Sequence, residues 1–225
     1  MQVVNYRSFD TLGVPPTIQI TQLPADTDPN TSGIQVIEGS TVTLGAKIAD
    51  DVQVRNVELL VNGQVVKNDV SYPFDLSTVM PTISGNGSDQ VTLQIEAIDT
   101  GGNTAVSSLI QLQLVRDTTP PQLISENISE GKNVGQSFRS FVFGFSKPLD
   151  PNTVSATTFQ LIGSDGAAIA PASIQLRNDD REVQLTYNQL ALGTYQYRID
   201  APEVTDRPGN ALGANVLATD FTVLP

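Results

Sequence analysis

The stretch "VTLQIEAID" at residues 91–99 alternates apolar and polar side chains, and this alternation decides the fold class. Successive side chains of an extended chain point to opposite sides, so the odd-numbered residues from Val91 to Ala97 share one face. The even-numbered residues share the other face, and three of these four are polar. The stretch therefore predicts a β-strand with one face in a core and one face toward solvent.

Similar short strand patterns, separated by turn residues, fill the rest of the chain. No amphipathic helix of ten residues or more is predicted, although "DPNTVSATT" (150–158) suits one short helical turn. Asn-Gly in "NGQ" (62–64) predicts a type I′ hairpin turn. The predicted strands are residues 17–23, 41–49, 54–63, 91–99 and 109–115 in the first half, and 140–146, 158–163, 172–177, 182–187, 194–200 and 218–223 in the second.

An internal repeat divides the chain in two. The stretch "LGVPPTIQI" (12–20) has a counterpart in "DTTPPQLIS" (117–125), with the Pro pairs 105 residues apart. A module of about 100 residues with about seven short strands is typical of an immunoglobulin-like sandwich. We therefore predict an all-β chain of two tandem immunoglobulin-like β-sandwich domains, at 14–117 and 118–225. Residues 1–13 are predicted to be an N-terminal segment or the tail strand of a preceding module, carried by "VVNYRSFD" (3–10).

Composition excludes several classes of function. The 225 residues contain no Cys and no His, which removes Cys/His zinc sites, thiol nucleophiles and Ser-His-Asp triads. Twelve basic residues face 24 acidic ones, and this net charge of −12 opposes binding to nucleic acid or anionic membrane surfaces. No apolar run is long enough to span a membrane. The first residues do not read as a signal peptide, so we expect any such signal elsewhere in a longer parent chain.

The motif Asp-x-x-Gly-Asn occurs twice, as "DTGGN" (99–103) and "DRPGN" (206–210), each time before a last apolar run. The first interpretation is a turn, in which Asp accepts backbone N–H groups and Gly and Asn adopt conformations that other residues resist. This interpretation needs no ligand. Two others, a calcium site and an aspartic-protease loop, stay open beside it.

The calcium interpretation rests on carboxylates that the sandwich topology gathers at one end. The loop after the second strand and the loop before the last strand of such a sandwich meet there, which places Asp50 and Asp51 near Asp99. Two or three carboxylates with backbone carbonyls suit a calcium ion of six to eight oxygen ligands. A weaker candidate set in the second module is Asp117, Asp150 and Asp206. Calcium is thus the cofactor we consider, and no other is indicated.

The protease interpretation rests on Asp99-Thr100-Gly101, which is similar to the catalytic turn of aspartic proteases. That mechanism needs two carboxylates sharing one proton. The second module has Asp-Arg-Pro at the equivalent point, and residues 107–117 lack the apolar-apolar-Gly motif expected after the turn. An enzyme is therefore the remote alternative, and we expect no catalytic residue.

The second module resembles the bacterial Ig-like domain found in S-layer and other large surface proteins. The resemblance is carried by "FGFSKPLDPNTVSATTFQLIGSDG" (143–166), "GTYQYRIDAPEVTDRPGNAL" (193–212) and "FTV" (221–223). The first module is similar to a bacterial Ig-like or cadherin-like repeat through "IADDVQVRNVELLVNGQ" (48–64) and "LQIEAIDTGGNTA" (93–105). The resemblance implies spacer or adhesive modules in extracellular chains, without a fixed ligand.

Two hypotheses for function follow. The first is a non-catalytic structural spacer or adhesive module pair at the cell surface, whose partners are the neighbouring domains of its parent chain. The second is a calcium-dependent adhesin or a glycan-binding accessory module, with a cell-surface protein or glycan as its partner. An exposed row of aromatic side chains or a deep cleft would favour the second, although the absence of Trp counts against glycan stacking.

Overall fold

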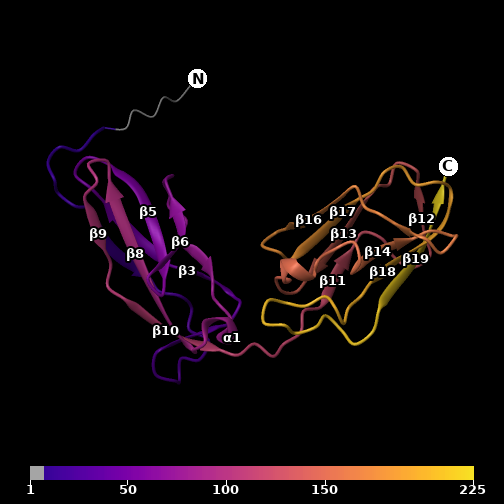
Figure 1. Cartoon of the computed structure of the whole chain (residues 1–225), viewed down its shortest axis with the longest axis horizontal. Helices are drawn as coiled ribbons and strands as arrows, with labels where there is room; N and C mark the ends of the chain where they lie inside the picture. Colours follow the sequence, from indigo (N-terminus) through magenta and orange to yellow (C-terminus); the bar gives the residue numbers. More distant parts are fainter. Residues whose placement is uncertain (1–7) are drawn as a thin grey trace. The chain divides into compact units, whose positions relative to one another are not determined.

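The computed structural model describes residues 8–225, which form two compact units, one ending at Arg116 and the other spanning Asp117–Pro225 (Figure 1). Nearly every regular element is a strand, which confirms the predicted pair of immunoglobulin-like β-sandwiches. The domain bounds drawn from the sequence stay a prediction, and Asp117 groups with the second unit in the structure. Of the predicted tail strand, residues 3–7 lie outside the described residues, and residues 8–10 are not in a strand.

The first unit is built from one large sheet and two small ones. Its strands are β1 (Thr17–Gln22), β2 (Ile34–Ile37), β3 (Thr41–Thr43), β4 (Gly45–Ala49), β5 (Val54–Val61), β6 (Gln64–Asp69), β7 (Ser77–Val79), β8 (Gln90–Asp99), β9 (Thr104–Val106) and β10 (Ile110–Val115). The large sheet has the order β2-β10-β8-β5-β6, with β9 paired to β8, and the small sheets are β1-β4 and β3-β7. The pair β2-β10 is parallel, while the other pairs in this unit are antiparallel.

Strand β8 lies in the centre of the first core, as its alternation predicts. The side chains of Val91, Leu93, Ile95 and Ala97 are at most 1% exposed. The same two-residue period carries Asp99 to the buried face at the end of the strand, where it is 0% exposed. The periodicity that builds the core therefore also places a carboxylate inside the unit.

The predicted strand 41–49 is wrong as a single element. It forms β3, which pairs with β7, and β4, which pairs with β1. A Cβ on Gly45 would lie 2.7 Å from the Cβ of Gln22, so the chain passes too close to β1 there for any larger residue. The β1-β4 pairing also shifts register between Ile20 and Gln22. This close approach and irregularity separate the two strands.

The second unit is a sandwich of two sheets, with strand orders β11-β13-β17-β16 and β12-β19-β18-β14-β15. Its strands are β11 (Leu123–Glu126), β12 (Lys132–Gly135), β13 (Ser140–Phe145), β14 (Phe159–Ile162), β15 (Ala168–Ile169), β16 (Ser173–Arg177), β17 (Glu182–Thr186), β18 (Gly193–Ile199) and β19 (Leu217–Leu224). The pair β12-β19 is parallel, as is β2-β10 in the first unit. Both units thus place their last strand parallel to an early one.

Aromatic rings fill the second core. Phe141, which is 0% exposed, lies within 5.1 to 5.4 Å, centroid to centroid, of Phe138, Tyr187, Tyr197 and Phe221. Edge-to-face and offset ring pairs of this kind stabilise a core beyond the area they bury. Together with Phe143, Phe145 and Tyr195, the buried rings belong to one continuous core cluster of the second unit.

The predicted turns are present. Asn62 and Gly63 have φ angles of 50° and 76°, as the type I′ hairpin between β5 and β6 requires. The predicted helical turn is the short 3-10 helix η1 (Pro151–Thr153), capped by the side chain of Asp150. The first unit has one short helix, α1 (Ile83–Asn86). Within residues 8–225, no helix has the length and apolar character to cross a membrane.

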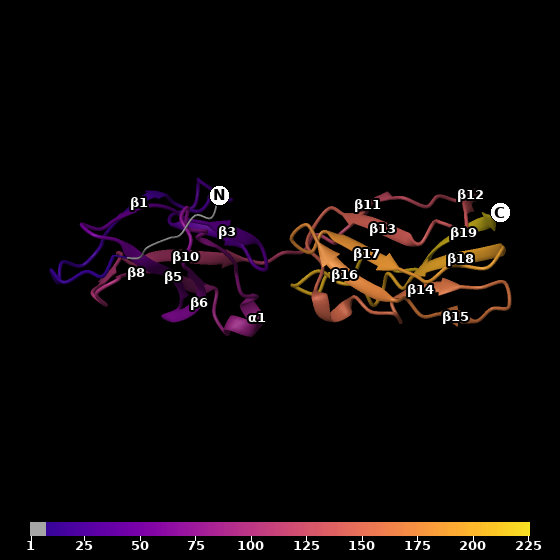
Figure 2. The same ribbon diagram turned by 90° about the horizontal axis from the view of Figure 1, so that it is seen from above.

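The chain arrives at and leaves each unit at opposite ends of its long strands. In the first unit, the N–H of Asp10 donates to Thr100, which follows the last residue of β8. The departing strand β10 pairs its residue Gln113 with Gln90, the first residue of β8. In the second unit, Asp117 lies beside Asn210 in the loop before β19. The last residues of β19 pair instead with the start of β18 and with β12, where Figures 1 and 2 both show the C-terminus.

Candidate functional site

Both copies of Asp-x-x-Gly-Asn form the same hydrogen-bonded turn. The Oδ1 atom of Asp99 accepts the N–H groups of Gly101 and Asn103, at 2.8 and 2.9 Å. The Oδ1 atom of Asp206 likewise accepts the N–H of Asn210 at 2.8 Å. In both copies the Asn side-chain amide donates to the Asp Oδ2, at 2.8 and 3.0 Å. The turn interpretation therefore describes the internal geometry of both copies.

The turn keeps the buried Asp99 ionised. Burial raises the pKa of its carboxyl group, but hydrogen bonds from the side chain and backbone of Asn103 and from the backbone of Gly101 and Gly102 lower the pKa further. The net result is a pKa below the ordinary value. A negative charge thus lies at the end of the first core at neutral pH.

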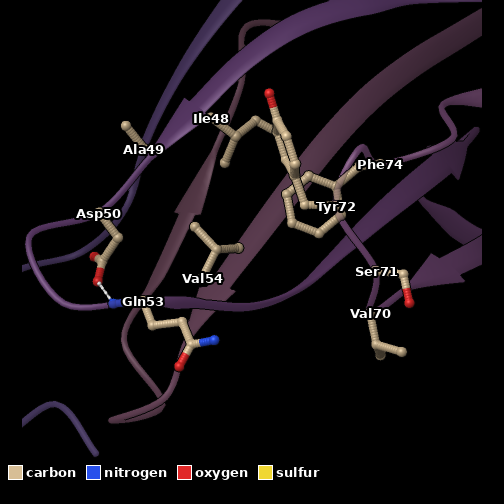
Figure 3. A pocket seen from close by; sticks show the side chains of 9 residues that line it. All are labelled: Ile48, Ala49, Asp50, Gln53, Val54, Val70, Ser71, Tyr72 and Phe74. Carbon is tan, nitrogen blue, oxygen red and sulfur yellow. Dashed lines mark hydrogen bonds between the residues drawn. The ribbon is translucent and has the colours of Figure 1, made fainter. Parts of the chain in front are cut away.

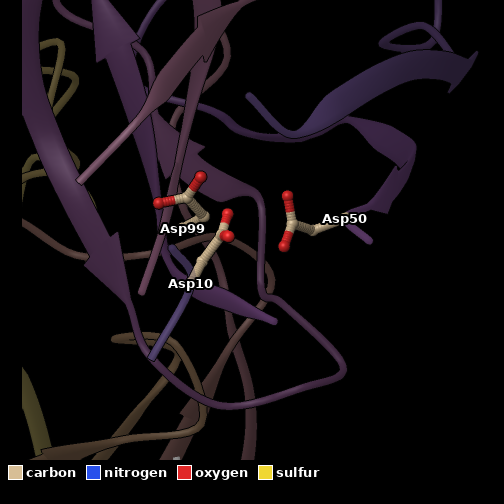
Figure 4. A group of neighbouring side chains, drawn as sticks. All are labelled: Asp10, Asp50 and Asp99. Carbon is tan, nitrogen blue, oxygen red and sulfur yellow. The ribbon is translucent and has the colours of Figure 1, made fainter. Parts of the chain in front are cut away.

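Two more aspartates lie beside Asp99 (Figure 4). Asp50 comes from the loop that follows β4, and Asp10 comes from the leading segment, which we define as residues 8–13. Each of the three residues offers a carboxylate oxygen, and these oxygens all lie within 4.8 Å of one another. Asp10 is only 3% exposed. We refer to Asp10, Asp50 and Asp99 as the carboxylate cluster.

Two oxygens of the carboxylate cluster have no hydrogen-bond partner. Asp10 accepts the N–H of Leu12 through Oδ1, and its Oδ2 is buried without a partner. Asp50 accepts the N–H groups of Val52 and Gln53 through Oδ2, and its Oδ1 is buried without a partner. The hydrogen bonds hold each carboxylate in place and leave its other oxygen unsatisfied.

The structure thus brings together two of the three residues predicted for a site in the first module. Asp51 is exposed and lies outside the cluster. The sequence reasoning missed Asp10, which comes from a segment that was assigned outside the module. A signal was present, because an Asp-Thr pair precedes both Pro pairs, with Asp10 five positions before Pro15 and Asp117 three positions before Pro120.

In the second unit a lysine lies between the corresponding aspartates. The Nζ of Lys147 donates to Asp206 at 2.9 Å and also to Asp117. The side chains of Asp117 and Asp206 are 8% and 2% exposed, so both charges are largely removed from water. The side-chain amide of Asn210 also donates to the carbonyl oxygen of Asp117, at 3.1 Å. A cation of the protein itself therefore lies between the two aspartates that were predicted to bind calcium.

Asp150, the third residue of the weaker calcium set, has a structural contact of its own. Its Oδ1 accepts the N–H and the side-chain amide of Asn152, at 3.0 and 2.9 Å, and so caps helix η1. The described residues contain no cluster of three possible metal ligands that includes Asp150, Asp117 or Asp206. The structure does not assemble the predicted site of the second module.

Two family models match the chain in adjacent regions. The model described as "Bacterial Ig-like domain" matches residues 117–223, and the model described as "Bacterial Ig domain" matches residues 16–93. The chain is a tandem of bacterial Ig-like domains. Asp10 and Asp99 lie outside the matched residues of the first domain, so the carboxylate cluster is not contained in its family pattern. The search among curated proteins found no match to this chain.

Solved structures of other tandem sandwiches are similar in fold. The fibronectin(III)-like modules of CbhA from Clostridium thermocellum are 14% identical, with 92% of this chain and 94% of that chain covered and a TM-score of 0.34. A titin Ig tandem is 11% identical over 92% and 96% of the two chains, with a TM-score of 0.32. The D00-D0 domain of intimin is 11% identical over 93% and 100%, with a TM-score of 0.31. Likenesses this weak carry no argument about function.

The ion pairs in the second bacterial Ig-like domain shift the pKa of Lys147. Burial lowers the pKa of its ammonium group, but Asp117 and Asp206 raise it more, so the pKa lies above the ordinary 10.5. A group whose pKa is higher in the folded state contributes stability that is complete below its unfolded pKa. That contribution is lost as the pH rises through the folded pKa.

We therefore expect the stabilisation by Lys147 to disappear in alkaline solution. Burial also raises the pKa of Tyr187 to about 12 and raises the pKa of Tyr197. The ionisation of these two tyrosines therefore also lowers the stability of the second unit as the pH rises. The measurement is the difference in free energy of unfolding between the wild type and Lys147→Met at several pH values from 7 to above 10.5. The difference should be constant up to that pH and then shrink, and a difference that stays constant throughout would contradict the ion-pair assignment.

A hollow of about 600 Å³ lies beside Asp50 in the first bacterial Ig-like domain (Figure 3). Its walls include Ile48, Val54 and Phe74, and the ring of Tyr72 is 85% exposed at its rim. Tyr72 and Phe74 pack edge to face, with centroids 5.9 Å apart. Among the residues that line the hollow, Asp50 is the one with a charged side chain.

Proposed function

We propose that the chain is a non-catalytic pair of spacer modules within a longer bacterial extracellular protein. The observation that supports this most is that the chain arrives at and leaves each unit at opposite ends of its long strands. Strand β8 has ten residues and so spans about 30 Å at about 3.3 Å per residue. Each unit therefore separates whatever precedes it from whatever follows it.

The parallel strand pairs add a mechanical argument. A force applied to the two ends of the second unit acts along β19, which is held by β12 and β18. The hydrogen bonds of the parallel pair β12-β19 are then loaded together, because sliding the strands breaks them at once rather than one after another. The pair β2-β10 has the same arrangement in the first unit. This geometry suits modules that carry tension.

The family supports the same proposal in general terms. Bacterial Ig-like domains typically occur in extracellular or surface proteins and are typically non-catalytic. We accordingly propose an extracellular location and, as partners, the neighbouring domains of the parent chain. Each unit has its own buried core, so neither depends on the other to bury its apolar residues.

The binding alternatives have less support. A glycan-binding accessory module would present a row of exposed rings, and among residues 8–225 the exposed large aromatic side chains are Phe9 and Tyr72. A protease would need two aspartates sharing one proton. Asp206, the repeat counterpart of Asp99, is instead paired with Lys147. These observations favour the spacer.

Single-molecule pulling from the two ends of the chain tests the proposal. We expect two separate unfolding steps, each releasing about 30 nm of chain, because about 100 residues extend to about 35 nm and the folded unit already spans part of that length. Both steps should require forces well above those at which unfolded chain is simply stretched. Unfolding of either unit without a resolved force peak would contradict a tension-bearing role.

A matched pair of proline variants sharpens this test. Asn133→Pro removes one backbone N–H from β12, which lies beside the terminal strand, while Ala168→Pro removes one from the edge strand β15. Both positions are exposed, so neither change alters the core. The unfolding force of the second unit should fall in Asn133→Pro and stay near the wild-type value in Ala168→Pro. An equal loss in both variants would remove the argument from the parallel pair.

A further inference from the structure

We propose that the carboxylate cluster binds one calcium ion, and that this ion fastens the leading segment to the first unit. The site consists of Asp10, Asp50 and Asp99, which lie on three separate segments of the chain and point toward one another (Figure 4). It goes beyond the spacer function, because it makes the attachment of the segment that precedes the first sandwich dependent on a soluble ion.

The unsatisfied oxygens indicate that a ligand is required. The Oδ2 of Asp10 and the Oδ1 of Asp50 are buried and have no hydrogen-bond partner. Asp10 is 97% buried, since its exposed fraction is 3%. Burying a charged oxygen without a partner is costly, and such groups in proteins are normally paired or bound to a metal. No ion pair among residues 8–225 involves Asp10, Asp50 or Asp99.

In the second unit, the corresponding pair of aspartates is accompanied by a positive charge. There the aspartate before the Pro pair, Asp117, and the motif aspartate, Asp206, are held together by the ammonium group of Lys147. In the first unit their counterparts are Asp10 and Asp99, and the third group is Asp50, a carboxylate instead of an amine. The first unit thus has three negative groups where the second has two negative groups and one positive group. A divalent cation would supply the missing positive charge.

The spacing and chemistry of the cluster suit calcium. Calcium binds oxygen ligands at about 2.3–2.6 Å, so oxygens on opposite sides of one ion lie about 5 Å apart at most. The three oxygens of the cluster lie within 4.8 Å of one another and therefore fit around one ion. Carboxylates are hard ligands that prefer hard cations, and backbone carbonyls and water complete calcium sites of this kind.

The ion would complete an attachment that is otherwise made of a few hydrogen bonds. The N–H of Ser8 donates to the side chain of Gln53 at 3.2 Å, and the hydroxyl of Thr100 donates to the carbonyl of Ser8. The carbonyl of Asp10 lies so close to Gly101 that a Cβ there would be 2.6 Å from it. Calcium bound to Asp10 would hold this segment at the end of β8, and its removal would release the segment.

Calorimetric titration of the whole chain with calcium chloride tests the proposal. We expect one ion per chain with a Kd of about 1 mM or tighter, in the range of extracellular calcium modules, and weaker binding of magnesium. Asp10→Asn keeps the acceptor for the N–H of Leu12 and removes one charge, and it should weaken binding at least tenfold. Asp51→Asn makes the same change at an exposed position outside the cluster and should bind as the wild type does.

A second variant separates the site from simple charge effects. Gly101→Ala retains all three carboxylates but displaces Asp10, because its methyl group would meet the carbonyl of Asp10. It too should lose calcium binding, and circular dichroism should show that its sandwich is intact. In the wild type, calcium should raise the melting temperature of the first unit by several degrees over EDTA and leave that of the second unchanged. No binding up to 10 mM, or equal binding by wild type and Asp10→Asn, would overturn the proposal.

Discussion

Replacing Lys147 with methionine should destabilise the second unit by about 3 kcal/mol, because removing one partner of a largely buried ion pair leaves an uncompensated charge. The change removes the ammonium group that pairs with Asp206, whose side chain is 2% exposed, and with Asp117, whose side chain is 8% exposed. Methionine has nearly the length of lysine, so the packing of the stem is kept. Denaturant unfolding at neutral pH measures the loss, which corresponds to a fall in melting temperature of about 10 °C or more.

The control for this prediction is the ion pair between Lys67 and Asp75 in the first unit. Its side chains are 32% and 57% exposed, and an exposed pair contributes about 1 kcal/mol at most. Lys67→Met should therefore leave the stability of its unit nearly unchanged. If Lys147→Met were as mild as Lys67→Met, the two aspartates would have to be neutralised in some other way, and the comparison with the carboxylate cluster would lose its basis.

The strands and the burial of Asp99 could be predicted because both follow from a local period. The alternation of residues 91–99 fixes which side chains enter the core, and it continues unbroken to Asp99. The turn geometry of Asp-x-x-Gly-Asn is also local, since its hydrogen bonds join residues at most four positions apart. Short-range patterns of this kind are visible in one sequence without knowledge of the tertiary structure.

The composition of the site could not be predicted in full, because it depends on contacts between distant segments. Asp50 and Asp51 are adjacent and chemically identical, and only the path of the loop after β4 turns one inward and the other to solvent. Asp10 reaches Asp99 across 89 positions of the sequence because the leading segment packs against Gly101. Lys147 was not recognised because an isolated lysine after a strand carries no signal of its two partners.

The division of the predicted strand 41–49 has a similar origin. In the sequence "TVTLGAKIA" every second residue from Val42 to Ile48 is apolar, and this alternation continues past Thr43. The break follows from the approach of Gly45 to Gln22 in β1, and the sequence does not show which distant residue the glycine approaches. Glycine inside a strand is a general sign of such a close approach.

The largest loss of stability is expected for Phe141→Ala, at about 3–5 kcal/mol, because a fully buried Phe leaves a cavity that its neighbours fill only in part. Phe141 contacts four other rings, among them Tyr197 in a stacked arrangement at 5.2 Å. The measurement is denaturant unfolding of the two-unit chain, with hydrogen exchange to assign each transition to its unit. The second unit should unfold at a much lower denaturant concentration.

A matched variant shows whether this loss comes from burial of the ring or from its type. Phe138 packs edge to face on Phe141 at 5.1 Å but is only partly buried, so Phe138→Ala should cost clearly less than Phe141→Ala. The first unit has a separate core, and its transition should keep the wild-type midpoint in both variants. A spacer requires this independence, because modules that carry tension in series must survive the unfolding of a neighbour. A midpoint of the first unit that falls together with the second would argue that the two unfold as one, against the proposed function.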